Sequence, residues 1–332
     1  MQLYEKCYII NMARIFAHVR LGGVFHSRIH VIALEKLQTK RRKKSMFHII
    51  DNPTAGKKGH QKNLETVKRA FDGRGVEYCI HTTTYKNEGK EIVEKLTQDG
   101  GKDIIVVGGD GTIHEVLNGM KNPAECRLGI IPSGTGNDFA EAANISLDAA
   151  KAVALILDGE AKETDYIEVG EKRCMNICGL GMDVDVLERC NRGKMRGKLK
   201  YLMSLVVSFF TYKGMKVTIE SNGEKIEKNV LLADVCNGKV YGGGIKISPV
   251  SVIDDGKFNV VVADFFKGYF KLIGAFIELM KGRILQYPAA THYLAEKIKF
   301  SFDKEITYQL DGELYKGTEF DAKICTGLKI FR

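Results

Sequence analysis

The feature that most constrains this fold is a short apolar run that ends in a glycine-rich turn. Residues 104–107 read Ile-Ile-Val-Val, and the turn Gly108-Gly-Asp-Gly-Thr112 follows at once, ahead of a segment with helical character. Such a run is typical of a buried strand in a parallel sheet. Glycines let backbone N–H groups approach an anion, and the N-terminus of the next helix adds partial positive charge. The segment predicts a strand, a turn and a helix that can bind phosphate; the alternative is an ordinary turn with Asp110 as a helix cap.

Two further turns have the same character. Asn52-Pro-Thr-Ala-Gly56 follows a strand expected at 47–51, and Ser133-Gly-Thr-Gly-Asn-Asp138 follows one expected at 127–131. The carboxyl ends of parallel strands meet at one edge of a sheet, so three such turns favour a shared phosphate site over three independent connections. None of them closes with Gly-Lys-Ser/Thr and none reads GxGxxG, which argues against a Walker-type site and a dinucleotide-binding Rossmann site.

The wider pattern divides the chain into two domains after an N-terminal extension at 1–45. From 46 to 163 strands and helices alternate, which predicts an α/β domain with a parallel sheet flanked by helices. From 164 to 332 short strands and glycine-rich turns dominate, which is typical of a β-sandwich or barrel; its C-terminal end is a candidate to return to the first domain. The strands are expected at 47–51, 77–82, 103–108, 127–131, 165–170, 173–178, 215–220, 229–236, 258–264, 297–302 and 306–310. The helices are expected at 60–73, 88–99, 112–121, 146–158, 196–212 and 267–281.

The formal net charge of +9 is concentrated in the N-terminal extension. Residues 1–45 contain ten Lys and Arg against two Glu, which leaves the remaining 287 residues with a net charge of +1. A body so close to neutral lacks the basic face that nucleic acids require, so no nucleic-acid partner is predicted. The extension is either a basic amphipathic anchor for anionic membranes or an artefact of the gene model, with Met46 as the true first residue.

Cysteines and apolar runs bear on the compartment. The eight cysteines show no CxxC pair and no metal-ligand spacing, which fits reduced thiols in the cytosol. The longest apolar run, residues 202–212, is about half the ~20 residues of a membrane-spanning helix. Six cations precede it, an arrangement that suits either docking on an anionic lipid surface or a solvated helix face. These cations are Arg189, Arg192, Lys194, Arg196, Lys198 and Lys200.

Together the three turns closely resemble the diacylglycerol kinase catalytic-domain family, which includes bacterial soluble diacylglycerol kinases, sphingosine kinases and ceramide kinases. Later segments continue the resemblance: Gly179-Leu-Gly-Met-Asp183, Gly242-Gly-Gly244, Asp254-Asp-Gly256 and Asp311-Gly-Glu313. The resemblance implies a two-domain NAD kinase/diacylglycerol kinase-like architecture with the active site in the interdomain cleft. It further implies an ATP-dependent lipid kinase that uses Mg²⁺ and transfers the γ-phosphoryl group of ATP to a lipid hydroxyl. Diacylglycerol, which would give phosphatidic acid, is the first candidate acceptor.

The resemblance also assigns catalytic and nucleotide-binding residues. Glu313 would be the general base that takes the proton of the lipid hydroxyl, with Asp311 beside it and the two roles open to exchange. Asp110 would hold Mg²⁺ through water. The ATP site would be lined by Asn52, Pro53, Thr54, Ala55, Gly56, Thr83, Gly108, Gly109, Asp110, Gly111, Thr112, Ile113, His114, Thr135, Gly136, Asn137 and Asp138.

A second, structural Mg²⁺ is implied at the turn that contains Asp255. Backbone carbonyls near Val252 and Lys257 would assist, and Asp165 would join the same network. From the residues alone, the Asp254-Asp-Gly256 segment is an ordinary connecting turn, and Asp311-Gly312 is a type I′ hairpin turn. His114 is better explained by packing or capping than by acid–base chemistry.

A two-chain lipid stays in the bilayer, so the resemblance implies a cytoplasmic enzyme that associates peripherally with the inner, anionic face of the membrane. Exposed sheet edges leave a homodimer open. One alternative is an NAD kinase-like enzyme, which the Ser133–Asp138 and Asp311–Glu313 segments argue against. Another is a non-catalytic nucleotide- or lipid-sensing module, which predicts loss of Asp110 or Glu313, and both are present.

Overall fold

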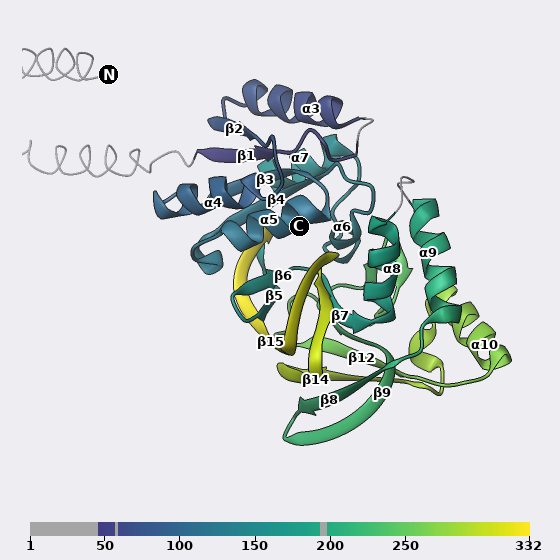
Figure 1. Cartoon of the computed structure of the whole chain (residues 1–332). Coiled ribbons are helices and arrows are strands. Elements are labelled where there is room, and N and C mark those ends of the chain that lie inside the picture. The colour runs from purple at the N-terminus through teal and green to yellow at the C-terminus, as the bar shows by residue number, and fades with distance from the viewer. Residues whose placement is uncertain (1–45, 57–58, 193–197) are drawn as a thin grey trace, which may run out of the picture. The chain divides into compact units, whose positions relative to one another are not determined.

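The computed structural model describes residues 46–56, 59–192 and 198–332. Residues 46–332 form one compact unit, shown in Figure 1. The extension at 1–45 lies outside the described residues, and so does the choice between its two interpretations.

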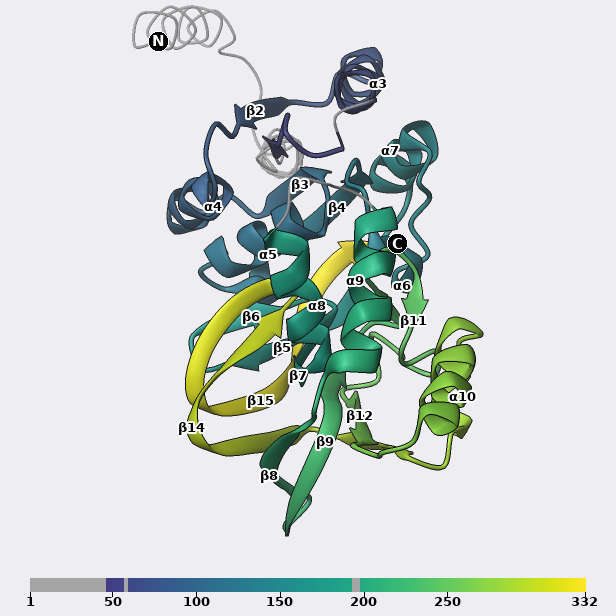
Figure 2. The same ribbon diagram turned by 45° about the vertical axis from the view of Figure 1, so that its right-hand side comes forward.

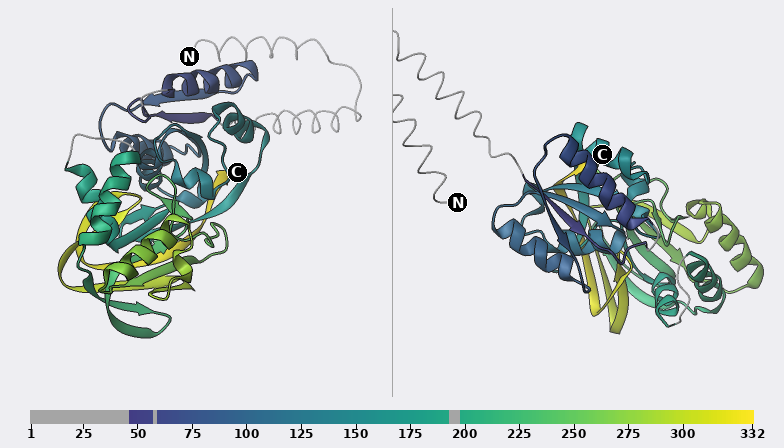
Figure 3. Two further views of the ribbon diagram at one scale, coloured as in Figure 1. Left: turned by 90° about the vertical axis from the view of Figure 1, so that its right-hand side faces the viewer. Right: turned by 90° about the horizontal axis from the view of Figure 1, so that it is seen from above.

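The first part of this unit is a parallel sheet with helices on both faces. Strand β3 is buried along its whole length, as expected for a strand covered on both sides. Helices α3 and α7 pack together on one face, and α4 packs with α5 on the other (Figures 1 and 3). The strands, in sheet order, are β2 (Tyr78–Thr82), β1 (Phe47–Asp51), β3 (Asp103–Gly108) and β4 (Arg127–Pro132). The α-helices are α3 (His60–Gly73), α4 (Glu88–Gln98), α5 (Asp110–Gly119), α6 (Asp138–Ala142) and α7 (Ala149–Asp158), and a 3₁₀ turn spans Pro123–Glu125.

The second part is rich in antiparallel strands. Its strands are β5 (Ala161–Val169), β6 (Lys172–Cys174), β7 (Ile177–Gly181), β8 (Met215–Ser221), β9 (Glu224–Cys236), β10 (Val240–Tyr241), β11 (Ile245–Lys246), β12 (Phe258–Asp264), β13 (Ala290–Ala295), β14 (Lys297–Leu310) and β15 (Glu313–Phe331). Its helices are α8 (Met182–Asn191), α9 (Lys198–Thr211) and α10 (Tyr269–Met280), with a 3₁₀ turn at Ile284–Gln286. Helices α8 and α9 pack against each other beside the strands (Figure 2).

Strand β15 connects the two parts. It begins as the antiparallel partner of β14, and near its end Lys329 and Ile330 pair in parallel with Arg127 and Leu128 of β4. The order β13-β12-β9-β7-β14-β15-β4-β3-β1-β2 therefore runs through both parts as one sheet. The apolar core of the α/β part accordingly includes Leu328, Ile330 and Phe331 from the C-terminal strand.

Three predicted elements of the α/β part have the predicted bounds, 47–51, 60–73 and 103–108, and the others are shifted at one or both ends. The helix expected at 146–158 begins at Ala149, because the Asp148 side chain caps it by accepting hydrogen bonds from Ala150 N and Lys151 N. The strands expected at 297–302 and 306–310 are one strand, β14, whose register against β15 shifts between Ser301 and Ile306. The strand expected at 173–178 is two strands, β6 and β7. Helices α6 and α8 and strands β10, β11, β13 and β15 were not predicted.

Candidate active site

The structure brings the three glycine-containing turns together at the carboxyl ends of β1, β3 and β4. The first and second turns are joined by a hydrogen bond from Asn52 Nδ2 to Thr112 Oγ1, 2.9 Å long. The second and third are joined by the backbone N–H of Ser133, which donates to Gly108 O at 2.7 Å. The predicted convergence of the turns is therefore present in the fold.

Glycine is required where these turns touch. A Cβ on Gly134 would lie 2.5 Å from the Cα of Gly109, and a Cβ on Gly56 would lie 1.9 Å from Ser133 O. Gly56 also has φ +61°, in the left-handed region that favours glycine. The turns pack backbone against backbone, which leaves their outward N–H groups and side chains facing a common space.

That space is an open cavity of about 610 Å³. Ten of the residues predicted for the ATP site line it: Asn52, Thr54, Ala55, Gly56, Thr83, Gly109, Asp110, Gly111, Thr112 and Thr135. The other predicted residues lie around it without lining it: Pro53, Gly108, Ile113, His114, Gly136, Asn137 and Asp138. Ile113 is part of the apolar core, and Asn137 holds the third turn by bonding both Gly134 N and Gly134 O.

Glu313, predicted as the base, lines the same cavity from the other side. It is the first residue of β15, and its side chain is 34% exposed. Lys86 Nζ donates to Glu313 Oε2 at 2.6 Å. Five lining residues were not predicted: Thr84, Tyr85, Lys86, Glu115 and Gly134. The sequence offers one signal for them. The run Thr82-Thr-Thr84 leaves the position of the predicted Thr uncertain by one residue, which draws attention to this turn but does not identify Lys86.

Asp311 has a different environment from Glu313, although only Gly312 separates them. Asp311 and Gly312 have φ +51° and +85°, and their neighbours Leu310 and Glu313 pair across the strands, as in a type I′ hairpin turn. The Asp311 carboxylate is buried and accepts two backbone N–H bonds of 2.8 Å, from Met175 and from Asn176.

Two side chains complete the contacts of Asp311. His114 Nδ1 donates to it at 3.0 Å and Cys174 Sγ at 3.1 Å. Because a carboxylate only accepts, the proton of the His114–Asp311 bond is on Nδ1, and His114 Nε2 then accepts from the Tyr315 hydroxyl at 2.9 Å. Burial raises the pKa of Asp311, but His114 and the N–H donors outweigh it and hold this pKa below its ordinary value. A carboxylate with four donors has little capacity to take a substrate proton.

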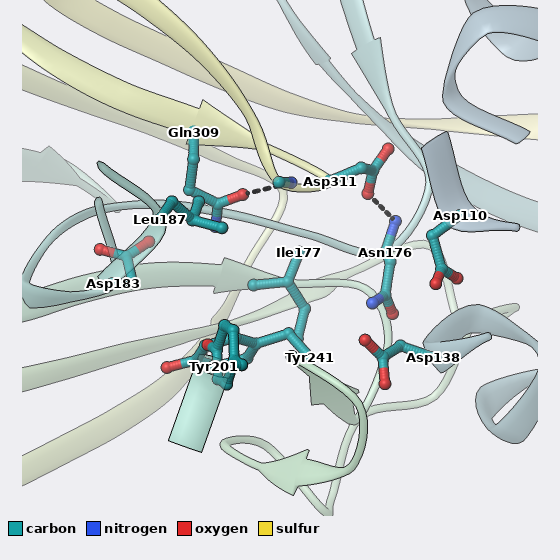
Figure 4. Close-up of a pocket in the computed structure, with 12 residues that line it drawn as sticks. Asp110, Asp138, Asn176, Ile177, Asp183, Leu187, Tyr201, Tyr241, Gln309 and Asp311 are labelled. Atoms are coloured by element: carbon teal, nitrogen blue, oxygen red, sulfur yellow. Dashed lines mark hydrogen bonds between the residues drawn. The ribbon is translucent and has the colours of Figure 1, made fainter. Parts of the chain in front are cut away.

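A second cavity, of about 190 Å³, lies on the other side of the hairpin tip and shares Asp110 with the first (Figure 4). Asp110 and Asp138 lie at one end of it, and Asp183 and Tyr201 at the other. Burial raises the pKa of Asp110, against the opposing effect of backbone N–H groups at the start of α6. The full lining is Asp110, Asp138, Asn176, Ile177, Asp183, Leu187, Tyr201, Tyr241, Gly242, Gln309, Asp311 and Gly312.

Comparison with known proteins identifies a family for this chain. The model of the diacylglycerol kinase catalytic domain matches residues 46–169, and that of the YegS C-terminal NAD kinase beta sandwich-like domain matches 176–327. A protein of Staphylococcus carnosus described as "Putative lipid kinase" is 31% identical over 229 residues, which cover 66% of this chain and 72% of the relative. The chain belongs to the diacylglycerol kinase catalytic-domain family.

Another relative agrees with this membership, and a solved structure has the same fold. The diacylglycerol kinase of Bacillus subtilis is 29% identical over 272 residues, 80% of this chain and 88% of the relative. The crystal structure of a diacylglycerol kinase from Bacillus anthracis superimposes with a TM-score of 0.70 at 24% identity, over 87% of this chain and 96% of that one. The predicted fold class, an α/β domain followed by a β-sandwich domain, is confirmed.

The residues predicted for a structural Mg²⁺ in this family member do lie together. Asp165 Oδ2 accepts from Gly256 N at 2.7 Å, and Asp255 Oδ1 accepts from Lys257 N at 3.0 Å. Burial, followed by the neighbouring carboxylates, raises the pKa of Asp165. Carboxylate oxygens and the nearby backbone carbonyls are hard ligands that suit Mg²⁺. Among the described residues, however, no cluster of three or more His, Cys, Asp or Glu is arranged to hold a metal, so this site stays a prediction.

The cations predicted for membrane docking are only partly described, because Lys194 and Arg196 lie outside the described residues and nothing is known of the Lys198 side chain. Arg189 pairs with Asp185 at 2.7 Å and Arg192 with Glu188 at 3.1 Å, each one turn away on α8. Lys200 Nζ donates to Cys190 O. Within the described part of the chain, no helix is long and apolar enough to span a membrane.

Proposed function

We propose that this chain is an ATP-dependent lipid kinase that transfers the γ-phosphoryl group of ATP to a lipid hydroxyl. Diacylglycerol, with phosphatidic acid as the product, is the first candidate acceptor, because relatives named diacylglycerol kinase match over most of the chain. The observation that carries the proposal is the position of Glu313 in the same cavity as the three glycine-containing turns. Phosphoryl transfer depends on positioning and charge neutralisation, and this cavity supplies both a phosphate cradle and a base.

In this proposal the nucleotide phosphates bind the three turns, whose residues, Thr112 and Thr135 among them, line the cavity. Mg²⁺, when bound, would neutralise the phosphates, and Asp110 is the carboxylate at the boundary of the two cavities that would hold it. The lipid hydroxyl enters between Asp110 and the hairpin tip. Glu313 takes its proton while the new P–O bond forms, and ADP is the leaving group.

Asp311 is proposed as the anchor of the hairpin that holds Glu313. The exchange of roles between the two acids is disfavoured, because all four contacts of Asp311 come from protein donors. Glu313 keeps its carboxylate in the cavity, with Lys86 as its partner. Intact Asp110 and Glu313 in one cavity also argue against a purely sensing module.

The acceptor would come from a membrane, so we propose peripheral association of a cytoplasmic enzyme with an anionic bilayer. Helices α9 and α10 contact each other (Figure 2). Both expose apolar side chains. Leu199, Met203 and Val207 recur at four-residue intervals on α9, and Ile277 and Met280 are exposed on α10. Such a face can enter the bilayer interface. A homodimer remains a prediction, which sedimentation equilibrium would test.

The test is transfer of ³²P from labelled ATP to a lipid panel in mixed micelles. The wild-type protein should label one hydroxyl lipid class. Glu313→Gln should reduce the rate at least about 100-fold, in line with general-base contributions, and Asp110→Ala should abolish transfer. Glu319→Gln, a change of an exposed carboxylate on the same strand, should leave the rate unchanged. Full activity of Glu313→Gln would refute the assignment of the base.

A further inference from the structure

The backbone of Lys86 is held in place beside the phosphate cavity, which Lys86 lines. The turn before α4 is held by Glu88, whose Oε2 accepts from Thr84, and by Glu115 of α5. Glu115 accepts backbone N–H bonds from Asn87 at 2.9 Å and from Gly89 at 3.2 Å. Because α5 begins within the second glycine-containing turn, at Asp110, the backbone of Lys86 is fixed relative to the phosphate cradle.

Charge makes Lys86 important in this cavity. Among the described residues that line it, Lys86 is the single cationic side chain, and the acidic ones are Asp110, Glu115 and Glu313. A nucleoside triphosphate brings several negative charges into this acidic surrounding. Backbone N–H groups and a bound Mg²⁺ offset part of this charge, but a terminal phosphate that leaves its nucleotide gains from a cation of the protein itself.

Lys86 is also able to move. Its side chain is 68% exposed, while its backbone is held, so the ammonium group can swing on a four-carbon stem. In the structure the ammonium group contacts Glu313 Oε2 at 2.6 Å. A lysine in that position occupies an oxygen of the proposed base, which has to be free to take the proton of the acceptor hydroxyl.

A phosphate in the cavity competes with Glu313 for this lysine. We propose that Lys86 exchanges partners during the reaction: it leaves Glu313 for the terminal phosphate of the bound nucleotide. The exchange neutralises the phosphoryl group that is transferred and frees the carboxylate that takes the proton. This inference rests on the proposed kinase function and adds a phosphate-binding catalytic residue, together with a coupling between nucleotide binding and the availability of the base.

The coupling predicts an unusual property of the inactive variant. Glu313→Gln removes the anion that competes for Lys86, so this variant should bind ATP about threefold to tenfold more tightly than the wild-type protein, although it does not transfer phosphate. ADP lacks the terminal phosphate, so its affinity should change less than twofold. A lysine with a purely structural role would produce neither effect.

The experiment measures ATP and ADP affinities by isothermal titration calorimetry with Mg²⁺, together with lipid kinase activity. Lys86→Met should weaken ATP binding about tenfold, leave ADP binding within twofold and lower kcat at least about tenfold. Lys86→Arg should restore most of the ATP affinity. Lys95→Met, a change of an exposed lysine on α4 away from the cavity, is the matched control. In the Glu313→Gln/Lys86→Met double variant the gain in ATP affinity should disappear.

Equal loss of ATP and ADP affinity in Lys86→Met, or no loss of either, would overturn the partner exchange even in an active lipid kinase. Unchanged ATP affinity in Glu313→Gln would overturn it as well. If the wild-type protein distinguishes ATP from ADP through Lys86 but labels no lipid, the inference on Lys86 is supported and the proposed lipid acceptor is refuted. The two proposals can therefore fail separately.

Discussion

The same isosteric change, from acid to amide, should lower the free energy of unfolding strongly at Asp311 and hardly at all at Glu313. Asp311→Asn replaces one carboxylate oxygen by an NH₂ group. In one orientation this group faces the Met175 N–H and His114, and in the other it faces the Asn176 N–H and Cys174; all four are donors. Either orientation of the amide loses two hydrogen bonds. Bonds to a charged group contribute about 1.5–3 kcal/mol each, so we expect a loss of about 3–5 kcal/mol in the free energy of unfolding.

Glu313→Gln should change the free energy of unfolding by less than about 0.5 kcal/mol, because the pair with Lys86 is largely exposed to water. The measurement is urea unfolding at pH 7 followed by far-UV circular dichroism, which suits a chain without tryptophan. A loss below about 1 kcal/mol for Asp311→Asn, or an equal loss for Glu313→Gln, would refute the assignment of anchor and base.

The same anchor predicts a pH dependence. The pKa of Asp311 is lowered in the folded protein, so its contribution to stability is complete above the ordinary carboxyl range and is lost as the pH falls through the folded pKa. Urea unfolding of wild type between pH 7 and pH 3 should show this loss, and Asp311→Asn should show less of it. Identical pH profiles would contradict the lowered pKa.

Three further changes test other contacts. Gly134→Ala places a Cβ 2.5 Å from Gly109 Cα, so ATP affinity measured by calorimetry should fall at least about tenfold, and an unchanged value would contradict the close packing of the turns. Tyr315→Phe removes the hydroxyl that donates to His114 and should cost about 1 kcal/mol in urea unfolding. Burial and then Asp183 raise the pKa of Asp234, so folded stability falls as the pH rises through that raised pKa. Asp234→Asn cannot ionise, so its stability relative to wild type in urea unfolding should increase as the pH rises from 5 to 8.

The α/β domain was predictable because its signals are local. Apolar runs, glycine-rich turns and helical spacing fix 47–51, 60–73 and 103–108 within a few residues of sequence. The convergence of the three turns follows from the rule that parallel strands present their carboxyl ends at one edge. The hairpin at Asp311-Gly312 is local in the same sense, since a two-residue turn with positive φ favours these residues.

Contacts between distant segments could not be predicted from the sequence. The donors to Asp311 come from Met175 and Asn176, which are 136 and 135 residues away, and from His114, which is 197 residues away. The role of Asp311 as an anchor is therefore invisible in its own neighbourhood. Lys86 was missed for the same reason, because its partner Glu313 is 227 residues distant.

The long last strand was missed because its pattern is broken. Strands of 3–10 residues are usual, whereas β15 spans 19 residues and passes from β14 in the antiparallel part to β4 in the α/β part. A strand whose neighbours change along its length has no single period.

The continuity of β15 also limits how the two parts of the fold can move relative to each other. Its first residues belong to the hairpin of Glu313, and its last ones pair with β4 of the α/β part, so neither part can rotate without twisting this strand. A register shift between Cys325 and Leu328, with Gly327 at φ +94°, interrupts its ladder with β5. Opening and closing should therefore bend the molecule at that interruption, and amide hydrogen exchange around Gly327 would report the motion at a place remote from any ligand.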